Sequence, residues 1–214
     1  MKYLKMLSLA AVAAMALMAF GAGTASATEL CKAPETPCSA ANMYPAGTTI
    51  FAHLTEGKEA VLTAGFATVR CTESTVKGKT TNTGSSTETV DGPIEELTFG
   101  NCNCTVTVLT KGELEVHTDT AAEATDDGIL TGKNSRVTIN CSGVSCIFGT
   151  AATGTEIGTI HSSTSPTTHA ELTANAKLPY FTGDASNFTC TLGSGTGSWK
   201  AEYTITEPKP LYIS

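Results

Sequence analysis

The chain has 214 residues, of which 15% are charged and 41% hydrophobic, and its formal net charge at pH 7 is −7. A negative surface argues against nucleic acid or anionic lipid as a partner, because both attract basic proteins. Threonine, serine and glycine are abundant, but the apolar residues are regularly spaced and not sparse, which excludes an intrinsically disordered chain.

The first 27 residues have the features of a secretory signal peptide. Lys2 and Lys5 precede an apolar run from residue 6 to residue 20, and the triplet ASA at 25–27 forms an A-x-A cleavage site. An apolar run of about 15 residues is shorter than the ~20 that a membrane-spanning helix needs. We therefore expect cleavage after Ala27 and no membrane span in the mature chain. The protein is expected to be exported, either secreted or held at the cell surface.

Residues 28–214 are expected to form one domain, because no linker rich in proline or serine divides them. Apolar and polar residues alternate with a period of two in many short segments, as in strands that have one face on a core. The clearest is SWKAEYTIT at 198–206, where Trp199, Ala201 and Tyr203 fall on one face. The other predicted strands are 48–54, 59–64, 66–71, 74–80, 94–99, 104–110, 112–118, 136–141, 156–160, 168–177 and 186–192.

Two of the later segments carry specific expectations. Within 186–192, strand alternation places Phe188, Cys190 and Leu192 on one inward face. After the prolines at 208 and 210, the segment Leu211–Ile213 is expected to be a short edge strand or a docked tail. Many short strands separated by glycine, asparagine, aspartate and proline predict an all-β fold. The simplest account is an antiparallel β-sandwich, of jelly-roll or immunoglobulin-like type, braced by disulfides.

All eight cysteines follow the predicted cleavage site, and an even number in an exported chain indicates disulfides. Two pairs are close enough in sequence for local bridges, Cys31 with Cys38 and Cys141 with Cys146. The complete set is Cys31, Cys38, Cys71, Cys102, Cys104, Cys141, Cys146 and Cys190.

The four remaining cysteines allow three pairings, which the strand pattern narrows. Cys71, Cys104 and Cys190 fall at inward positions of predicted strands, whereas Cys102 lies at a turn just before its strand. A bond between Cys102 and Cys104 would be strained, because same-face neighbours on a strand lie ~6.6 Å apart with parallel side chains. We therefore expect Cys71–Cys102 and Cys104–Cys190, with the exchanged partners as the alternative.

The close spacing of Cys102 and Cys104 admits a second interpretation, as a metal clamp or a redox pair. Zinc sites and redox pairs usually contain Cys-x-x-Cys, which this sequence lacks. His161 and His169 flank a short loop and, together with Glu171, would give a three-ligand metal site. We favour disulfides for the cysteines and surface positions for the histidines, and we assign no metal or cofactor site.

No catalytic motif emerges from the sequence. It lacks the Gly-x-Ser-x-Gly elbow of serine hydrolases and the His-Glu-x-x-His motif of metalloproteases. Glu95, Glu96, Glu113 and Glu115 are candidates for the paired carboxylates of a glycan-acting enzyme only because nothing excludes them. Aromatic residues make up 6% of the chain, which argues against a sugar cleft lined with aromatic rings.

Several motifs carry a resemblance to known sequences. They are ELCK at 29–32 followed by Pro37-Cys38, YPAGTTIFA at 44–52, VRCTESTVKG at 69–78, LTF at 97–99 with Cys102, and WKAEYTITEPKPLY at 199–212. In this order they resemble an uncharacterised family of small exported, cysteine-containing, β-rich bacterial proteins. The resemblance implies a secreted β protein, and it assigns no activity and no functional residue.

These observations favour a structural or interaction module without catalytic activity. We expect it to bind an extracellular protein or a cell-envelope component through loops at one end of the fold or through a sheet edge. Two alternatives stay open. One is a glycan-acting enzyme on a β-sandwich, which requires a cleft with one carboxylate of raised pKa. The other is a protein that binds a small ligand or a metal.

Overall fold

The computed structural model describes residues 28–85, 87–118, 127–182 and 187–214. The predicted signal peptide, residues 1–27, lies outside the described residues. Within the described ranges, no helix is long and apolar enough to cross a membrane.

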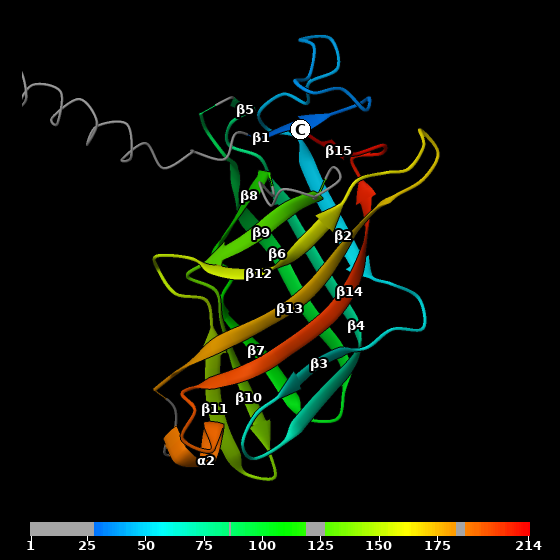
Figure 1. Cartoon of the computed structure of the whole chain (residues 1–214). Helices are drawn as coiled ribbons and strands as arrows, with labels where there is room; N and C mark the ends of the chain where they lie inside the picture. The colour runs from blue at the N-terminus through cyan, green and yellow to red at the C-terminus, as the bar shows by residue number, and fades with distance from the viewer. Residues whose placement is uncertain (1–27, 86, 119–126, 183–186) are drawn as a thin grey trace, which may run out of the picture.

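Strands dominate the described part of the chain, as the sequence predicts, and Figure 1 shows their arrangement. The elements are β1 (Thr28–Cys31), β2 (Thr49–Leu54), β3 (Ala60–Thr63), β4 (Thr68–Lys79), β5 (Gly84–Ser85), β6 (Val90–Cys102), β7 (Thr105–Thr110), β8 (Glu113–Thr118), β9 (Asp127–Lys133), β10 (Arg136–Cys141), β11 (Val144–Gly149), β12 (Thr155–His161), β13 (Ala170–Phe181), α2 (Asn187–Thr191), β14 (Thr196–Glu207) and β15 (Tyr212–Ile213).

Eight antiparallel strands close into a barrel, in the order β2, β4, β6, β8, β9, β12, β13 and β14. β2 closes the ring because it pairs with both β14 and β4. Below it, β3 pairs with the same two strands and continues the wall. The all-β, antiparallel prediction is confirmed, but the expected arrangement as two packed sheets is not what the structure shows. A ring closed by pairing on both sides of β2 leaves no break at which two separate sheets could be defined.

The lower half of the barrel carries an additional sheet. The end of β13 pairs with β11, which pairs with β10, which pairs with β7. β7 follows β6 in the chain, yet β7 pairs only with β10, and β6 pairs only with β4 and β8. Both strands lie wholly in the described chain. We call the unpaired boundary between β6 and β7 the seam.

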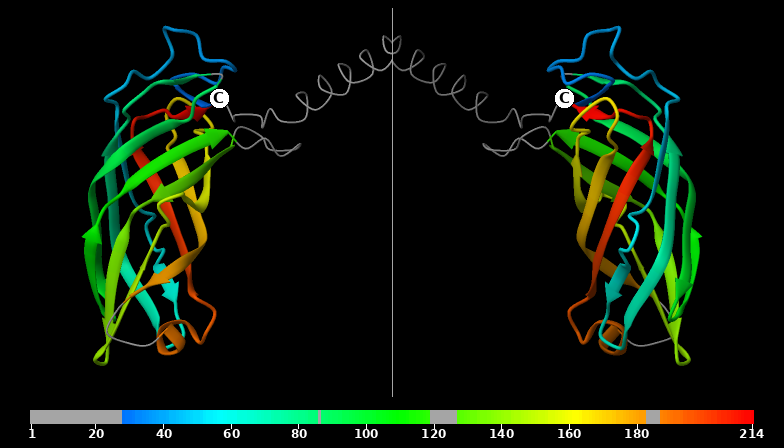
Figure 2. Two further views of the ribbon diagram at one scale, coloured as in Figure 1. Left: turned by 90° about the vertical axis from the view of Figure 1, so that its left-hand side faces the viewer. Right: turned by 90° about the vertical axis from the view of Figure 1, so that its right-hand side faces the viewer.

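The two ends of the barrel are capped by different elements, as Figure 2 shows from both sides. At the upper end, β1 pairs with β15 and β5 to form a small three-stranded sheet. Its buried side chains include Leu30 and Ile213, and the backbones of Glu29 and Ser214 exchange two hydrogen bonds of 2.7 and 3.0 Å. At the lower end, α2 lies beside the β3–β4 turn, and the disulfide Cys146–Cys190 joins it to β11 (Figure 1).

All eight cysteines form disulfides, and two of the expected pairings are confirmed. They are Cys31–Cys38 and Cys71–Cys102, the latter lying directly opposite each other on β4 and β6. The expected pairing of Cys104 with Cys190 is wrong, because Cys104 bonds to Cys141. Asn140 of β10 lies opposite Thr105 of β7. The next residue beyond each of them is Cys141 and Cys104, respectively, so these two cysteines also lie opposite each other.

The local pairing of Cys141 with Cys146 is also wrong, since Cys146 bonds to Cys190. The reason is the tightness of the β10–β11 turn. Ser142 and Gly143 alone form it, both with positive φ, so Val144 already faces Cys141. In this register Cys146 lies opposite Ile139 and not opposite Cys141, and it bonds to Cys190 of α2.

Several segments differ from the predicted secondary structure, and β1, β5, β9 and β11 are strands that were not predicted. Segment 186–192, predicted as a strand, contains the helix α2. Among the strands that were not predicted, β9 is part of the barrel wall although it contains two glycines. Added Cβ atoms at Gly128 and Gly132 would approach the Ile213 and Ile157 side chains within 2.8 and 2.5 Å. These glycines therefore make room for side chains of neighbouring elements and do not mark turns.

Candidate functional site

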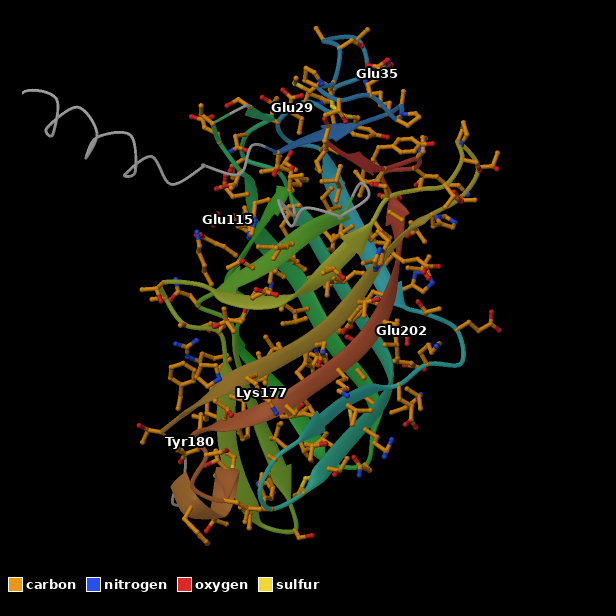
Figure 3. The ribbon with its side chains drawn as sticks, in the orientation of Figure 1. Glu29, Glu35, Glu115, Lys177, Tyr180 and Glu202 are labelled. Atoms are coloured by element: carbon orange, nitrogen blue, oxygen red, sulfur yellow. A yellow bond between two sulfur atoms is a disulfide. The ribbon has the colours of Figure 1, made fainter. Side chains whose placement is uncertain are left out.

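The lower end of the barrel is free of charged residues over four separate segments. They are residues 60–69, 97–110, 137–149 and 187–199, which contain the β3–β4, β6–β7 and β10–β11 turns and α2 with its following loop. Just beyond this surface, Arg70 and Glu59 form an exposed ion pair of 2.7 Å. In contrast, the upper end carries Glu29 and Glu35, which are labelled in Figure 3.

Large apolar side chains are exposed in the same uncharged segments. Among the described residues, the exposed large hydrophobic side chains are Phe188, Leu192 and Leu109, at 69%, 66% and 52% relative exposure. Phe188 and Leu192 are four residues apart and therefore lie on the same side of a helical turn. Cys190, between them, is completely buried and bonds to Cys146. The disulfide thus holds the turn against the barrel while the two apolar side chains face solvent.

The backbone fixes the position of Leu192. Its φ is +52°, in the left-handed region that a leucine adopts only at an energetic cost. Its amide donates a hydrogen bond of 2.7 Å to the Phe188 carbonyl, and the Gly65 amide donates one of 2.9 Å to the Cys190 carbonyl. A Cβ at position 65 would lie 2.4 Å from the Leu192 nitrogen, so glycine is required there. An exposed leucine is thereby kept in a strained conformation by surrounding contacts.

An open hollow of about 580 Å³ lies next to this surface, where β6 ends and β7 begins. Its walls include the disulfide Cys104–Cys141 and the side of Cys102, which is bonded to Cys71. Asn103, at the turn, accepts a hydrogen bond from the Arg70 amide at 2.8 Å and donates one to the Thr68 carbonyl at 3.0 Å. Cys102 and Cys104, for which a metal clamp or a redox pair was the alternative, are therefore both bonded in disulfides, as expected, and they line a polar hollow.

The histidine site that was considered as an alternative does not assemble. His161 lies directly opposite Glu171 in the β12–β13 ladder, but His169 lies beside Lys209, with 3.3 Å between its Nε2 and the lysine Nζ. Among the described residues, no group of three histidine, cysteine, aspartate or glutamate side chains could hold a metal ion. His161, His169 and Glu171 therefore do not form the three-ligand site.

The carboxylates considered for a glycan-acting enzyme lie on the barrel wall next to lysines. Glu95 forms an ion pair of 3.4 Å with Lys79, and Glu96 lies opposite Lys77 in the β4–β6 ladder. Glu115 accepts a short hydrogen bond from Lys133, which lowers the pKa of the Glu115 carboxyl. A general acid requires the opposite shift, so Glu115 has no sign of that role.

The exposed pair Phe188 and Leu192 was missed because a strand period was applied to a helical turn. Strand alternation puts residues 188, 190 and 192 on one face, whereas a helix puts residue 190 opposite the other two. The sequence did contain a signal: Gly193 and Gly195 follow directly, and glycine commonly ends a helix.

None of the family models, curated proteins or solved structures compared with this chain matches it. The fold and its exposed surfaces are therefore the grounds on which a function is proposed.

Proposed function

We propose that the protein is an exported, non-enzymatic interaction module that binds an extracellular protein or a cell-envelope component through its lower end. One observation carries the proposal: the exposed large apolar side chains Phe188, Leu192 and Leu109 all lie in the uncharged segments. The centres of protein interfaces are depleted of charged residues and enriched in aromatic ones. Phe188 and Leu192 are the residues we assign as anchors.

The bracing of the lower end supports this role. Cys71–Cys102, Cys104–Cys141 and Cys146–Cys190 all lie there, whereas the upper end has Cys31–Cys38. A surface that is already ordered loses less conformational entropy when it binds. Four disulfides also suit an oxidising compartment, in agreement with the predicted export signal. The partner surface that fits is an uncharged apolar pocket.

Site-specific photo-crosslinking in the native host tests the proposal. A benzoylphenylalanine is placed at position 188, and the control carries it at position 40, an exposed alanine in the loop after β1 at the upper end. We expect an adduct with one defined partner from position 188 and none from position 40. Equal labelling from both positions, or no adduct from either, would contradict the proposal.

The partner identified in this way is then purified for a direct binding measurement. The double substitution Phe188→Ser and Leu192→Ser is expected to weaken binding by at least about tenfold, as the loss of interface anchors usually does. Ala40→Ser is the matched control and should leave the affinity unchanged. If the double variant binds as well as the parent protein, the lower end is not the binding surface.

A further inference from the structure

The interior of the barrel holds two neighbouring apolar cavities between the capped ends. The upper cavity has a volume of about 80 Å³ and is lined by side chains such as Ile50, Ala52 and Leu211. The lower cavity has a volume of about 120 Å³, and Trp199 and Ala174 line it. Both cavities are bounded by the same five side chains, Val76, Ile94, Leu114, Leu130 and Leu172.

Voids of this size are uncommon in a protein interior. Native cores are packed like organic crystals, and spaces larger than a water molecule are few in each domain. The atoms that line a void lose their van der Waals partners on that side. A molecule that fills the space restores those contacts, so the folded state is stabilised when such a molecule is bound.

Polar groups along the lower cavity bond to other groups of the protein. The Ser74 hydroxyl donates to the Thr98 carbonyl at 2.9 Å, so it can accept from the Tyr203 hydroxyl, also at 2.9 Å. Arg136 is the charged residue of the lining, and its guanidinium bonds to the Ser135 and Thr150 carbonyls. A buried water needs two to four polar partners, and most of the side chains that line the lower cavity are apolar. The cavity therefore suits an uncharged apolar occupant.

The seam supplies a route from solvent to the lower cavity. Both ends of the barrel are capped, but no backbone ladder joins β6 to β7 within the described chain. Phe99 of β6 and Val106 of β7 lie on the two sides of the seam, and both line the lower cavity. Across its upper part, Lys111 Nζ donates a hydrogen bond to the Glu95 carbonyl. Side-chain movement at the seam can admit a ligand without opening the closed ring above.

We infer that the lower cavity is a binding site for a small neutral apolar molecule of about the size of one benzene ring. The mostly apolar lining indicates an apolar ligand, and the volume limits its size. An apolar cavity of about 150 Å³ lined by aliphatic and aromatic side chains stays dry and binds benzene in another protein. The site is distinct from the surface around Phe188 and Leu192, and it does not depend on the function proposed for that surface.

Quenching of tryptophan fluorescence by iodobenzene tests the inference on the mature, disulfide-bonded protein. Trp199 is the single tryptophan of the chain and lines the lower cavity, so an iodine atom bound there quenches its emission. We expect quenching that saturates with iodobenzene concentration. Purely linear quenching, as for a free tryptophan derivative in water, would overturn the inference.

Two matched substitutions locate the site. Ala174→Leu fills the lower cavity and is expected to weaken iodobenzene binding by about tenfold or more. Ala52→Leu makes the same change in the upper cavity and should alter the affinity by less than about twofold. If both variants bind iodobenzene like the parent protein, the occupied site is not the lower cavity.

A size series on the parent protein covers the case in which Ala174→Leu does not fold. 4-Iodobiphenyl carries the same iodinated ring with a second ring attached, which a cavity of about 120 Å³ cannot enclose. We expect it to bind at least about tenfold more weakly than iodobenzene. Equal or tighter binding of 4-iodobiphenyl would show an unspecific hydrophobic surface and refute the cavity site.

Discussion

The upper end of the barrel is closed mainly by hydrogen bonds, whereas the lower end is held mainly by disulfides. At the upper end, the backbones of β1, β5 and β15 pair with one another, and the Ser163 hydroxyl accepts from the Leu211 amide at 3.0 Å. At the lower end, three disulfides join β4 to β6, the start of β7 to β10, and β11 to α2.

The two ends also differ in the kind of side chain that they expose to solvent. The upper end buries its apolar residues and exposes charged ones, including Lys32, whose ammonium lies 5.5 Å from the centre of the Tyr44 ring. The lower end exposes Phe188 and Leu192 and has no charge in its four segments. A surface that exposes apolar side chains cannot be ordered by burying them, so covalent bonds order it. This difference supports our proposal that the lower end is the contact surface.

The largest expected effect comes from removing the bridge of the lower end. Cys146 and Cys190 are 44 residues apart, and the loop-entropy estimate for replacing both with alanine is a loss of about 4 kcal/mol. The same change at Cys31 and Cys38, 7 residues apart, should cost about 2.5 kcal/mol. Urea denaturation of the two double variants measures both values. An upper-end variant that is the less stable of the two would reverse our comparison.

The stability of the folded protein is expected to fall at alkaline pH because of Tyr203, which lies in the barrel wall between the two ends. Burial raises the pKa of Tyr203 from 10.0 to about 12, so the folded state holds its proton where the unfolded state has lost it. The associated stability is fully present below pH 10 and is lost as the pH rises toward 12, by about 2.7 kcal/mol in total. Tyr203→Phe removes this dependence, and urea denaturation across pH 9–12 should show its curve diverging from that of the parent protein. Parallel curves would contradict the assignment.

A smaller effect is expected at the ion pair of Glu115 and Lys133, which joins β8 to β9. Their hydrogen bond lowers the pKa of Glu115 and raises that of Lys133. The carboxylate's contribution is present above its unfolded pKa of 4.5 and is lost as the pH falls through the lower folded value. Glu115→Gln should cost about 1 kcal/mol at pH 7. Glu113→Gln, on an exposed neighbour, is the control and should change the unfolding free energy much less.

The smallest expected effect has the opposite sign. Leu192 is exposed and has a φ of +52°, so Leu192→Gly relieves strain and is expected to stabilise the fold by up to about 1 kcal/mol. Thermal unfolding measures this change. The same variant should bind the partner of the lower end more weakly, which separates stability from binding. A destabilised variant would mean that Leu192 packs against the barrel instead of facing a partner.

The strands were predictable where one face is polar and the other apolar. In β14, Ala201, Tyr203 and Ile205 are buried as the alternation predicts, and β10 has the predicted bounds Arg136–Cys141. The prediction of two strands at 66–71 and 74–80 was wrong, because polar Thr72 and Glu73 interrupt the pattern without ending β4. Alternation reports which way a side chain points, and it does not report how far a strand continues.

The closure of the barrel and two of the four disulfides could not be predicted from the sequence, for a related reason. Both depend on which strands become neighbours, and β2 joins β14 and β4 over long separations in the chain. Cys104 and Cys141 were not paired in advance because nothing local brings β7 beside β10. Phe188 and Leu192 were placed inward because five residues are too few for a helical period to be distinguished from a strand period.

The pairing of β1 with β15 has a consequence for the topology of the polypeptide. Glu29 and Ser214 exchange two backbone hydrogen bonds, so these two positions lie one strand spacing apart. A short peptide linker could join them into a cyclic backbone without disturbing the barrel, and the ring could then be cut in an exposed loop elsewhere. A circular permutant of this kind would have its new termini at a chosen loop. The choice of loop would decide whether a fusion partner or surface is attached at the lower end or away from it.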